Sequence, residues 1–113
     1  AAQIGIANHE AIAAAKGGIE AMVRAAAASY SSRGLRINAI APSLTDTPLS
    51  QAIIGSEQAL EISKRMHPTG DVGEASDVAS LAAWLHSDQA KFVTGQTFVI
   101  DGGISKIVPK PKV

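Results

Sequence analysis

The residues with the clearest chemical potential are two threonines, Thr45 and Thr47, in a polar loop that follows Pro42. The residues before this loop, 35–41, are mostly apolar, as in a parallel strand that is covered on both faces. Open α/β sheets bind ligands just outside the carboxyl ends of their strands. The segment 34–49 therefore predicts a ligand site at the end of a strand, and it points to a cofactor as the ligand.

A long helix is predicted before the loop, over residues 10–32. Apolar side chains recur there at helical spacing, and most of the remaining positions are alanine, the residue with the highest helix propensity. Gly17 and Gly18 interrupt the pattern and cost about 1 kcal/mol each relative to alanine. We therefore expect something to pack closely against these two glycines.

A long connection, a helix and a strand are predicted after the loop. The connection 43–72 is expected to contain one or two short helices within residues 50–66. Residues 74–86 have the apolar stripe of an amphipathic helix, and residues 97–100 are typical of a second buried strand. Asp101–Gly102–Gly103 then predicts a tight turn. The order helix, strand, helices, strand indicates a parallel crossover, and two such strands do not form a stable sheet by themselves.

The composition limits the function classes. The 113 residues correspond to one domain or less, and ten basic residues balance ten acidic ones, which disfavours nucleic acid and anionic membranes as partners. The sequence contains no cysteine and no metal-ligand spacing, so we predict no metal site and leave the isolated His67 and His86 without a ligand role. The N-terminus lacks the pattern of a signal peptide and no apolar run is long enough to span a bilayer, so we expect a cytoplasmic protein without a membrane partner.

Three motifs in order resemble the C-terminal half of a short-chain dehydrogenase/reductase. They are RINAIAPSLTDTPL, GDVGEASDVASLAAWLHSD and AKFVTGQTFVIDGG, and the resemblance covers residues 1–105, with 106–113 as an extended tail. The resemblance implies an α/β fold, namely the C-terminal portion of a Rossmann-like doubly wound parallel sheet with three α/β/α layers. It also implies reduction of a carbonyl or enoyl group by hydride transfer from NAD or NADP.

In the family that the sequence resembles, the proline loop covers the nicotinamide end of the cofactor. By position, Pro42 belongs to this loop, and the N–H of Thr45 and the hydroxyl of Thr47 would hold the carboxamide. Thr47–Pro48 has a second interpretation as a helix start, with threonine as cap and proline at the first helical position. Both roles are compatible. Ser43 stands where the family usually has glycine.

The catalytic motif departs from the family pattern. Lys16 fits the lysine that holds the ribose, but Ile12 occupies the tyrosine position of Tyr-x-x-x-Lys and cannot transfer a proton. A branch that reduces enoyl thioesters uses a seven-residue spacing, which here places His9 as the acid. Offsets of four and seven return to the same helix face, and a pKa of about 6.5 suits histidine for proton transfer. The alternative is that His9 is only a surface or cap histidine beside Asn8, a good N-cap.

The sequence is consistent with two functions from different classes. The first is an NAD(P)-dependent short-chain oxidoreductase of which this chain is an incomplete part, without the glycine-rich cofactor segment. The second is a catalytically inactive member that acts as an oligomerisation or structural module, which Ile12 favours. The resemblance implies a homo-oligomer formed through the 10–32 helix and the C-terminal strand. The small-molecule substrate is undetermined, because the apolar residues of 49–66 suit either an apolar substrate wall or a plain amphipathic helix.

Overall fold

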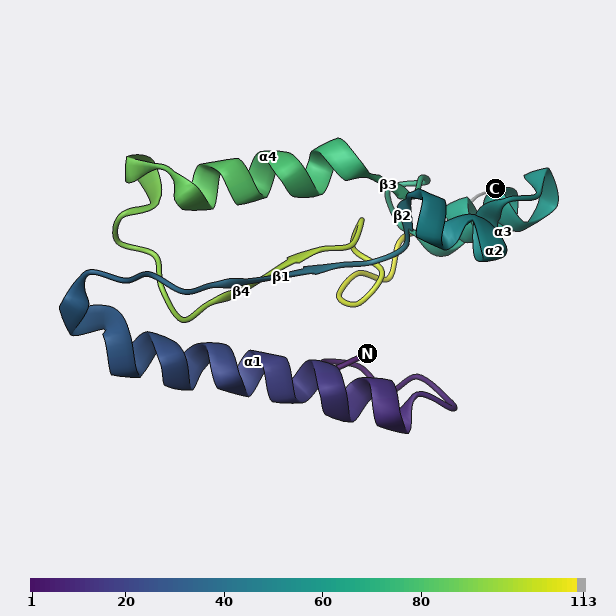
Figure 1. The fold of residues 1–113 in the computed structure, drawn as a ribbon. Helices are drawn as coiled ribbons and strands as arrows, with labels where there is room; N and C mark the ends of the chain where they lie inside the picture. Colours follow the sequence, from purple (N-terminus) through teal and green to yellow (C-terminus); the bar gives the residue numbers. More distant parts are fainter. Residues whose placement is uncertain (112–113) are drawn as a thin grey trace. The chain divides into compact units, whose positions relative to one another are not determined.

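The computed structural model describes residues 1–111, and the chain divides into two compact units. Unit 1 comprises residues 1–40 and 83–98, and unit 2 comprises residues 41–82 and 99–113. The chain is α/β, and Figure 1 shows its elements in the sequence order α1, β1, β2, α2, α3, β3, α4 and β4. The order helix, strand, helices, strand matches the sequence-based prediction.

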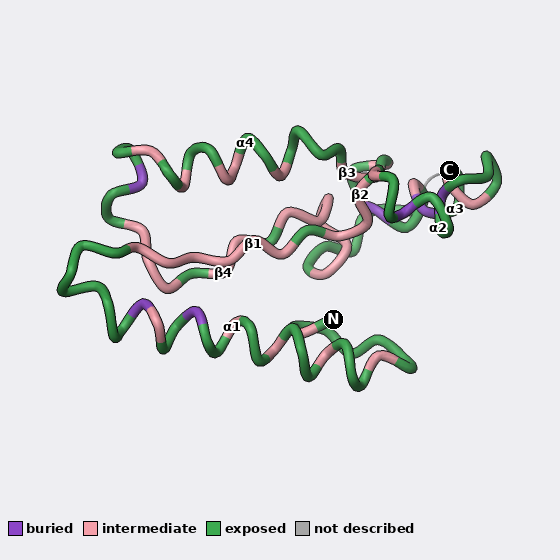
Figure 2. Tube along the Cα trace, viewed as in Figure 1, coloured by how far each residue is buried: buried purple, intermediate pink, exposed green. Residues whose placement is uncertain are grey.

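Helix α1, Glu10–Tyr30, is the main element of unit 1 and confirms the predicted long helix. A short 3-10 turn, Ser31–Arg33, extends it, and Gly34 ends it with a left-handed φ of 79°, a conformation that glycine adopts without strain. Only Val23 and Ala27 are buried along the helix, and both lie in its C-terminal half (Figure 2). The N-terminal half of α1 therefore has little contact with the rest of unit 1.

The close packing expected at Gly17 and Gly18 is not found among the described residues. A Cβ atom added at either glycine would meet no atom within 4 Å. In unit 1 a glycine from another segment approaches α1 instead: a Cβ atom added at Gly95 would lie 3.6 Å from the Cβ of Ala27. The pair of glycines interrupts the helical pattern, and no described residue fills the space beside it.

Strand β1, Ala39–Pro42, is shorter than the predicted strand 35–41 and begins later. Backbone pairing is incomplete at residues 37 and 38. The carbonyl of Ile37 accepts from the N–H of Gly95 at 2.7 Å, but the N–H of Ile37 donates to a side chain, Thr94 Oγ1, at 3.1 Å. The N–H of Gln96 likewise donates to a side chain, Asn38 Oδ1, at 3.1 Å. These two side-chain bonds interrupt the regular ladder on which a strand depends.

Arg36, a polar residue in an apolar segment, has a structural role in unit 1. Its guanidinium donates to the carbonyl of Leu85 at 2.7 Å, of Ser87 at 3.3 Å and of Val93 at 3.2 Å. Leu85 belongs to the last turn of α4, Ala75–His86, whose C-terminal carbonyls have no partner within the helix. Arg36 therefore closes the end of α4 and the following 3-10 turn, Asp88–Ala90.

Strands β1 and β4, Thr97–Ile100, form a two-stranded sheet, and β4 has the predicted bounds. Their direction follows from the hydrogen bonds. In unit 1 the N–H of Ala39 donates to the carbonyl of Gln96, and in unit 2 the N–H of Ser43 donates to the carbonyl of Ile100. Both partners advance by four residues in the same direction, so the strands are parallel, as the predicted crossover requires.

Unit 2 contains the connection between β1 and α4. It holds α2, Gln51–Ile54, and α3, Glu57–Met66, which confirms the prediction of short helices there. A second parallel pair, β2 (Thr45–Asp46) with β3 (Gly73–Glu74), was not predicted from the sequence. Ser56 begins α3 because its hydroxyl accepts from the N–H of Ala59 at 3.1 Å.

The end of the chain follows β4 through the predicted turn, in which Gly102 and Gly103 have φ values of 59° and 89°. Residues 107–111 of the predicted extended tail, 106–113, form no helix or strand, and residues 112 and 113 lie outside the described part. Over residues 1–111, no helical segment has both the length and the apolar character that a membrane crossing requires.

Candidate functional site

The predicted ligand loop, residues 43–50, is held together by the hydroxyl of Ser50. Ser50 Oγ donates to the carbonyl of Thr45, 2.6 Å away, lies 3.0 Å from the carbonyl of Thr47, and accepts from the N–H of Thr47 at 3.0 Å. Ser50 is buried, so its bonds are shielded from water. The structure therefore brings Thr45 and Thr47 together around one buried hydroxyl, which the sequence analysis did not single out.

Thr45 lies in β2, and its backbone N–H and carbonyl do not pair with the neighbouring strand β3. The N–H of Gly73 donates to the carbonyl of Leu44 at 3.0 Å, so the carbonyl next to Thr45 makes the bond to β3. Successive residues of a strand direct their polar groups to opposite sides, so the N–H and carbonyl of Thr45 point away from β3. The carbonyl bonds Ser50, while Thr45 Oγ1 donates to the carbonyl of Ser43 at 3.0 Å.

Thr47 is the N-cap of the 3-10 helix η2, Pro48–Ser50, and Pro48 is the first residue of that helix. This confirms the second interpretation of Thr47–Pro48 as a helix start. The carbonyl of Thr47 also accepts from Gln51 Nε2 at 3.0 Å, and Gln51 Nε2 donates to Asp46 Oδ1 at 2.8 Å. The backbone of Thr47 is thus fixed by its own loop.

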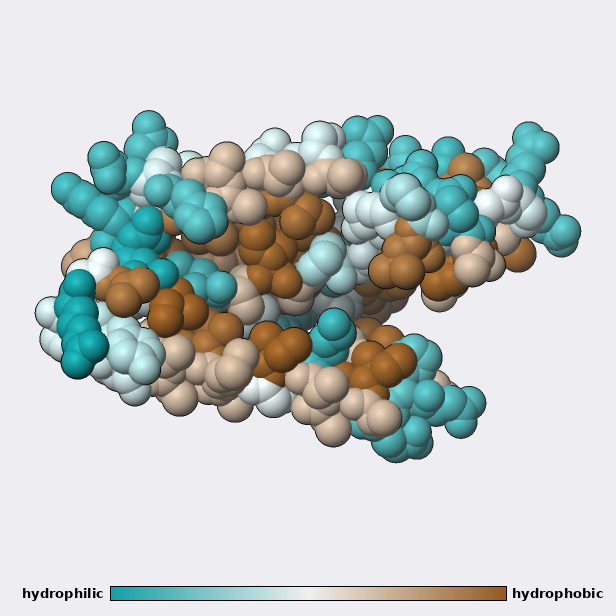
Figure 3. All heavy atoms as spheres, in the orientation of Figure 1, coloured by the Kyte–Doolittle hydropathy of each residue, from teal (hydrophilic) through white to brown (hydrophobic). Residues whose placement is uncertain are grey.

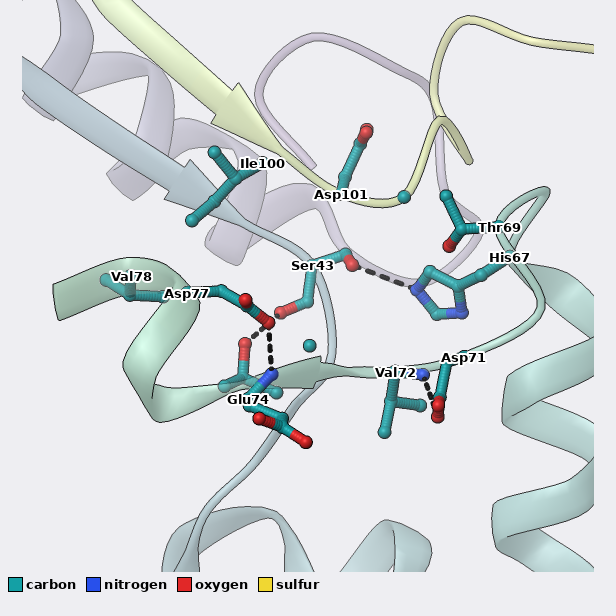
Figure 4. A pocket seen from close by; sticks show the side chains of 13 residues that line it. Ser43, His67, Thr69, Asp71, Val72, Glu74, Asp77, Val78, Ile100 and Asp101 are labelled. Carbon is teal, nitrogen blue, oxygen red and sulfur yellow. Dashed lines mark hydrogen bonds between the residues drawn. The ribbon is translucent and has the colours of Figure 1, made fainter. Parts of the chain in front are cut away.

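A pocket of about 450 Å³ opens in unit 2 beside this loop (Figure 4). Its lining is both polar and apolar and comes from the ends of β1 and β4, the segment after α3, and the start of α4. Of the three predicted loop residues, Thr45 lines the pocket, whereas Pro42 and Thr47 do not. The predicted cofactor residues of the loop therefore do not all face one cavity.

His67 is a second residue of this region that the sequence analysis missed. It was left without a ligand role, and the structure places it at the end of α3 with only 5% of its surface exposed. Its Nε2 lies 2.9 Å from Ser43 Oγ, and its Nδ1 lies 2.7 Å from the carbonyl of Ser63. An isolated histidine followed by proline carried no sequence signal for this contact, because Ser43 is 24 residues away.

The pKa of Asp101 departs clearly from its ordinary value. The hydroxyl of Ser105 donates to the Asp101 carboxylate, and this bond lowers the pKa of Asp101 below 3.8. The N–H groups of Gly103 and Ser105 act in the same direction, while partial burial opposes them. The carboxylate therefore stabilises the turn after β4, which agrees with the prediction that Asp101–Gly103 is a turn.

The two predicted catalytic residues, His9 and Lys16, both belong to unit 1, whereas Pro42, Thr45 and Thr47 belong to unit 2. His9 is the N-cap residue of α1 and lies just before the first helical residue. Its side chain does not cap the helix; its Nδ1 lies 2.8 Å from the carbonyl of Ala7. Lys16 is exposed, and Ile12 between them has 48% of its surface exposed.

The arrangement at His9 fixes which ring nitrogen can act as a base. A carbonyl only accepts hydrogen bonds, so the contact with Ala7 places the proton of the neutral ring on Nδ1. The unprotonated nitrogen is then Nε2, for which no bond within residues 1–111 is found. An imidazole and an ammonium group, those of His9 and Lys16, thus lie seven residues apart in sequence near the start of α1.

The chain resembles proteins of known type over most of its length. Residues 1–105 match the family described as Enoyl-(Acyl carrier protein) reductase. The chain is 43% identical to 3beta-hydroxysteroid dehydrogenase 1 of Eggerthella lenta over 82% of its length and 36% of that protein. It is 42% identical to 2-(S)-hydroxypropyl-CoM dehydrogenase 3 of Xanthobacter autotrophicus over 92% of its length and 42% of that protein.

Solved structures share the fold. A gluconate 5-dehydrogenase from Burkholderia cenocepacia in complex with NADP and tartrate superposes with a TM-score of 0.85 at 25% identity, covering 95% of this chain and 42% of that one. A 4-hydroxyisoleucine dehydrogenase complexed with NADH superposes with a TM-score of 0.76 at 29% identity, covering 81% of this chain and 38% of that one. The chain spans about two fifths of the length of these relatives.

Proposed function

Because the chain belongs to the short-chain dehydrogenase/reductase family, we propose that it supplies the nicotinamide end of the cofactor site in an NAD(P)-dependent oxidoreductase. The contacts to the pyrophosphate and adenosine of the cofactor come, in this proposal, from residues outside 1–113. The bound cofactor supplies the hydride. The residues of this chain bind the carboxamide and ribose and transfer the proton.

The observation that carries the proposal is the organisation of residues 43–50 at the carboxyl end of a parallel strand. The Ser50 hydroxyl fixes the carbonyls of Thr45 and Thr47, while the Thr45 N–H is directed away from β3. A carboxamide has both donors and acceptors, so it fits the Thr45 N–H together with the Thr47 hydroxyl. Pro42 precedes this loop without donating a backbone hydrogen bond. This donor set supports binding of the nicotinamide end.

Lys16 and His9 are proposed for the chemical step. Lys16 would hold a ribose hydroxyl through its ammonium. Hydride addition makes one substrate atom electron-rich, either the oxygen of a carbonyl group or a carbon of an enoyl group. His9 would give a proton to that atom. After proton loss, His9 is the neutral tautomer that the Ala7 contact favours, with Nε2 unprotonated. The exposed Lys16 and the half-buried His9 leave both groups accessible to ligands.

A small molecule is the proposed substrate. Dehydrogenation of a secondary alcohol, or the reverse reduction of a carbonyl, is favoured because the two relatives described above are named as dehydrogenases of hydroxyl compounds. Leu49, Ile53 and Ile62 are each more than half exposed, which supports an apolar substrate wall. Either NAD or NADP is compatible with the proposal, since related structures contain NADH and NADP.

A second candidate function is an inactive oligomerisation module, which the exposed apolar side chains of α1 favour. Ile12, Ile19 and Met22 expose 48%, 44% and 62% of their surfaces, and apolar residues appear on the visible surface of α1 (Figure 3). Covering such apolar side chains with another protein surface lowers the free energy of the system. In this alternative, α1 and the C-terminal strand would assemble copies of the protein, and Ile12 would replace the catalytic tyrosine without functional compensation.

The first experiment is the intact mass of the purified protein under denaturing conditions, followed by assays with NADH and NADPH. A mass well above 11.6 kDa, with cofactor binding and turnover of a carbonyl or enoyl substrate, would support the oxidoreductase. The opposite result is a mass of 11.6 kDa with no binding of either cofactor, alone or with a partner chain. A stable oligomer with that behaviour would support the structural module.

A further inference from the structure

Ser43 and His67 form a partly buried contact in unit 2, to which the function proposed above assigns no role. Ser43 follows β1 directly, and His67 follows the last residue of α3. Figure 4 shows the serine side chain directed at the imidazole, with 2.9 Å between Ser43 Oγ and His67 Nε2. The contact therefore joins the end of a strand to the end of a helix.

The imidazole is oriented by its other nitrogen. His67 Nδ1 lies 2.7 Å from the carbonyl of Ser63, and a carbonyl can only accept, so Nδ1 donates. In the neutral ring Nε2 is then an acceptor, and the hydroxyl of Ser43 donates to it. The backbone of His67 is also fixed, because its N–H donates to the carbonyl of Lys64 and its carbonyl accepts from the N–H of Gly70.

Ser43 transmits this anchoring to the loop. Its N–H donates to the carbonyl of Ile100 at 3.3 Å, which sets its position against β4. Its carbonyl accepts from Thr45 Oγ1 at 3.0 Å, which fixes the side chain of the next loop residue but one. Since the Ser43 hydroxyl bonds His67, all three polar groups of Ser43 are hydrogen-bonded. Ser43 alone therefore connects His67 to Thr45.

We propose that His67 is a positioning residue for the cofactor loop: through Ser43 it sets the conformation in which Thr45 and Thr47 bind the nicotinamide end. This inference rests on the proposed function of the same loop. His67 touches no cofactor itself. Its effect is on binding, because a loop that is already ordered loses less conformational entropy when the ligand binds.

Four variants separate this role from general stability. Ser43→Ala removes the contact from the serine side. His67→Asn removes it from the histidine side, while the amide can still donate to the carbonyl of Ser63. His67→Gln reaches the position of Nε2 and retains a partner for Ser43. The double variant Ser43→Ala/His67→Asn completes a cycle, and His86→Asn on α4 is the matched control.

The measurement is the dissociation constant of NADH and NADPH, by titration of the purified protein, together with kcat, KM and Tm. We expect Ser43→Ala and His67→Asn each to weaken cofactor binding about fivefold, the effect of one hydrogen bond. The double variant should be no weaker than either single variant, and His67→Gln should retain most of the affinity. The control His86→Asn should bind like the wild type, and kcat at saturating cofactor should change little.

The outcomes distinguish the inference from the proposed function. A wild-type protein that binds neither NADH nor NADPH overturns the proposed function and this inference with it. A wild-type protein that binds cofactor while Ser43→Ala and His67→Asn bind equally well overturns the inference alone. Losses of Tm without any change in affinity, or losses that add in the double variant, also overturn it, since they show two independent structural contacts.

Discussion

The loop 43–50 and the N-terminal half of α1 carry the proposed functional residues of this protein, and they differ in how those residues are held. In the loop, Thr45 and Thr47 are bonded to Ser50, and Thr45 is bonded to Ser43. On α1, Lys16 is exposed and His9 has a single side-chain bond, to Ala7. One region is ordered by contacts within its own unit, and the other presents side chains from a helix with few contacts.

The difference indicates where each role depends on its surroundings. Binding a carboxamide requires two polar groups at a fixed separation, which a buried hydroxyl such as that of Ser50 maintains. Proton transfer from His9 requires only that one nitrogen reach the substrate, and the helix start provides this without a network. Two properties can therefore be tested: whether the loop is ordered by its own hydrogen bonds, and whether His9 and Lys16 act without a supporting hydrogen-bond network.

The largest effect is expected for His9→Ala. If His9 is the acid, kcat should fall by about 10²- to 10⁴-fold, the usual contribution of general acid–base catalysis, with cofactor affinity unchanged. Steady-state kinetics and cofactor titration of the purified protein measure the two quantities, and His86→Ala is the matched control. A kcat within about twofold of the wild type would mean that His9 is only the N-cap residue of α1.

Ser50→Ala tests the ordering of the loop. The variant leaves two carbonyls and one N–H without their shared partner, so we expect the free energy of unfolding to fall by about 1–3 kcal/mol. Chemical denaturation measures it. Ser29→Ala is the control, because Ser29 is exposed and donates only to the carbonyl of Ala25, so its loss should be within about 0.5 kcal/mol. Equal losses in both variants would contradict the view that the loop depends on Ser50.

Gly18→Ala tests the sparse contacts of α1. No atom lies within 4 Å of the added Cβ, so the better helix propensity of alanine should raise stability by about 1 kcal/mol. Gly34→Ala is the opposite control, because a φ of 79° should make that change unfavourable. A loss of stability in Gly18→Ala, with dissociation of an oligomer in sedimentation, would show that another chain packs on this face.

The smallest effect is expected for Asp101→Asn and depends on pH. The pKa of Asp101 is lowered below 3.8 in the folded protein, so its contribution to stability is complete above that value and is lost as pH falls through the folded pKa. Between about pH 5 and pH 2, the interval in which carboxylates ordinarily become protonated, the free energy of unfolding should therefore fall more in the wild type than in Asp101→Asn. Identical acid dependence of the denaturation midpoints would show that the turn does not depend on the carboxylate.

Local patterns predicted most of the elements. The helix 10–32 was found as α1 with its short extension, the strand 97–100 was found with the same bounds, and Asp101–Gly103 was found as a turn. These features depend on propensities and on backbone conformations that act over a few residues. The start of β1 was predicted too early, because hydrogen bonds through the side chains of Thr94 and Asn38 interrupt the backbone pairing at residues 37 and 38.

The sequence by itself determined the order of the elements, the position of the threonine loop after a strand, and the seven-residue spacing of His9 and Lys16. Only the tertiary structure decided that Ser50 joins Thr45 to Thr47, that Gly73–Glu74 pairs with Thr45–Asp46, and that His67 bonds Ser43. The physical reason is separation along the chain. A short-range pattern records which conformation each residue prefers, whereas the partner of a buried polar group is chosen by packing and strand register.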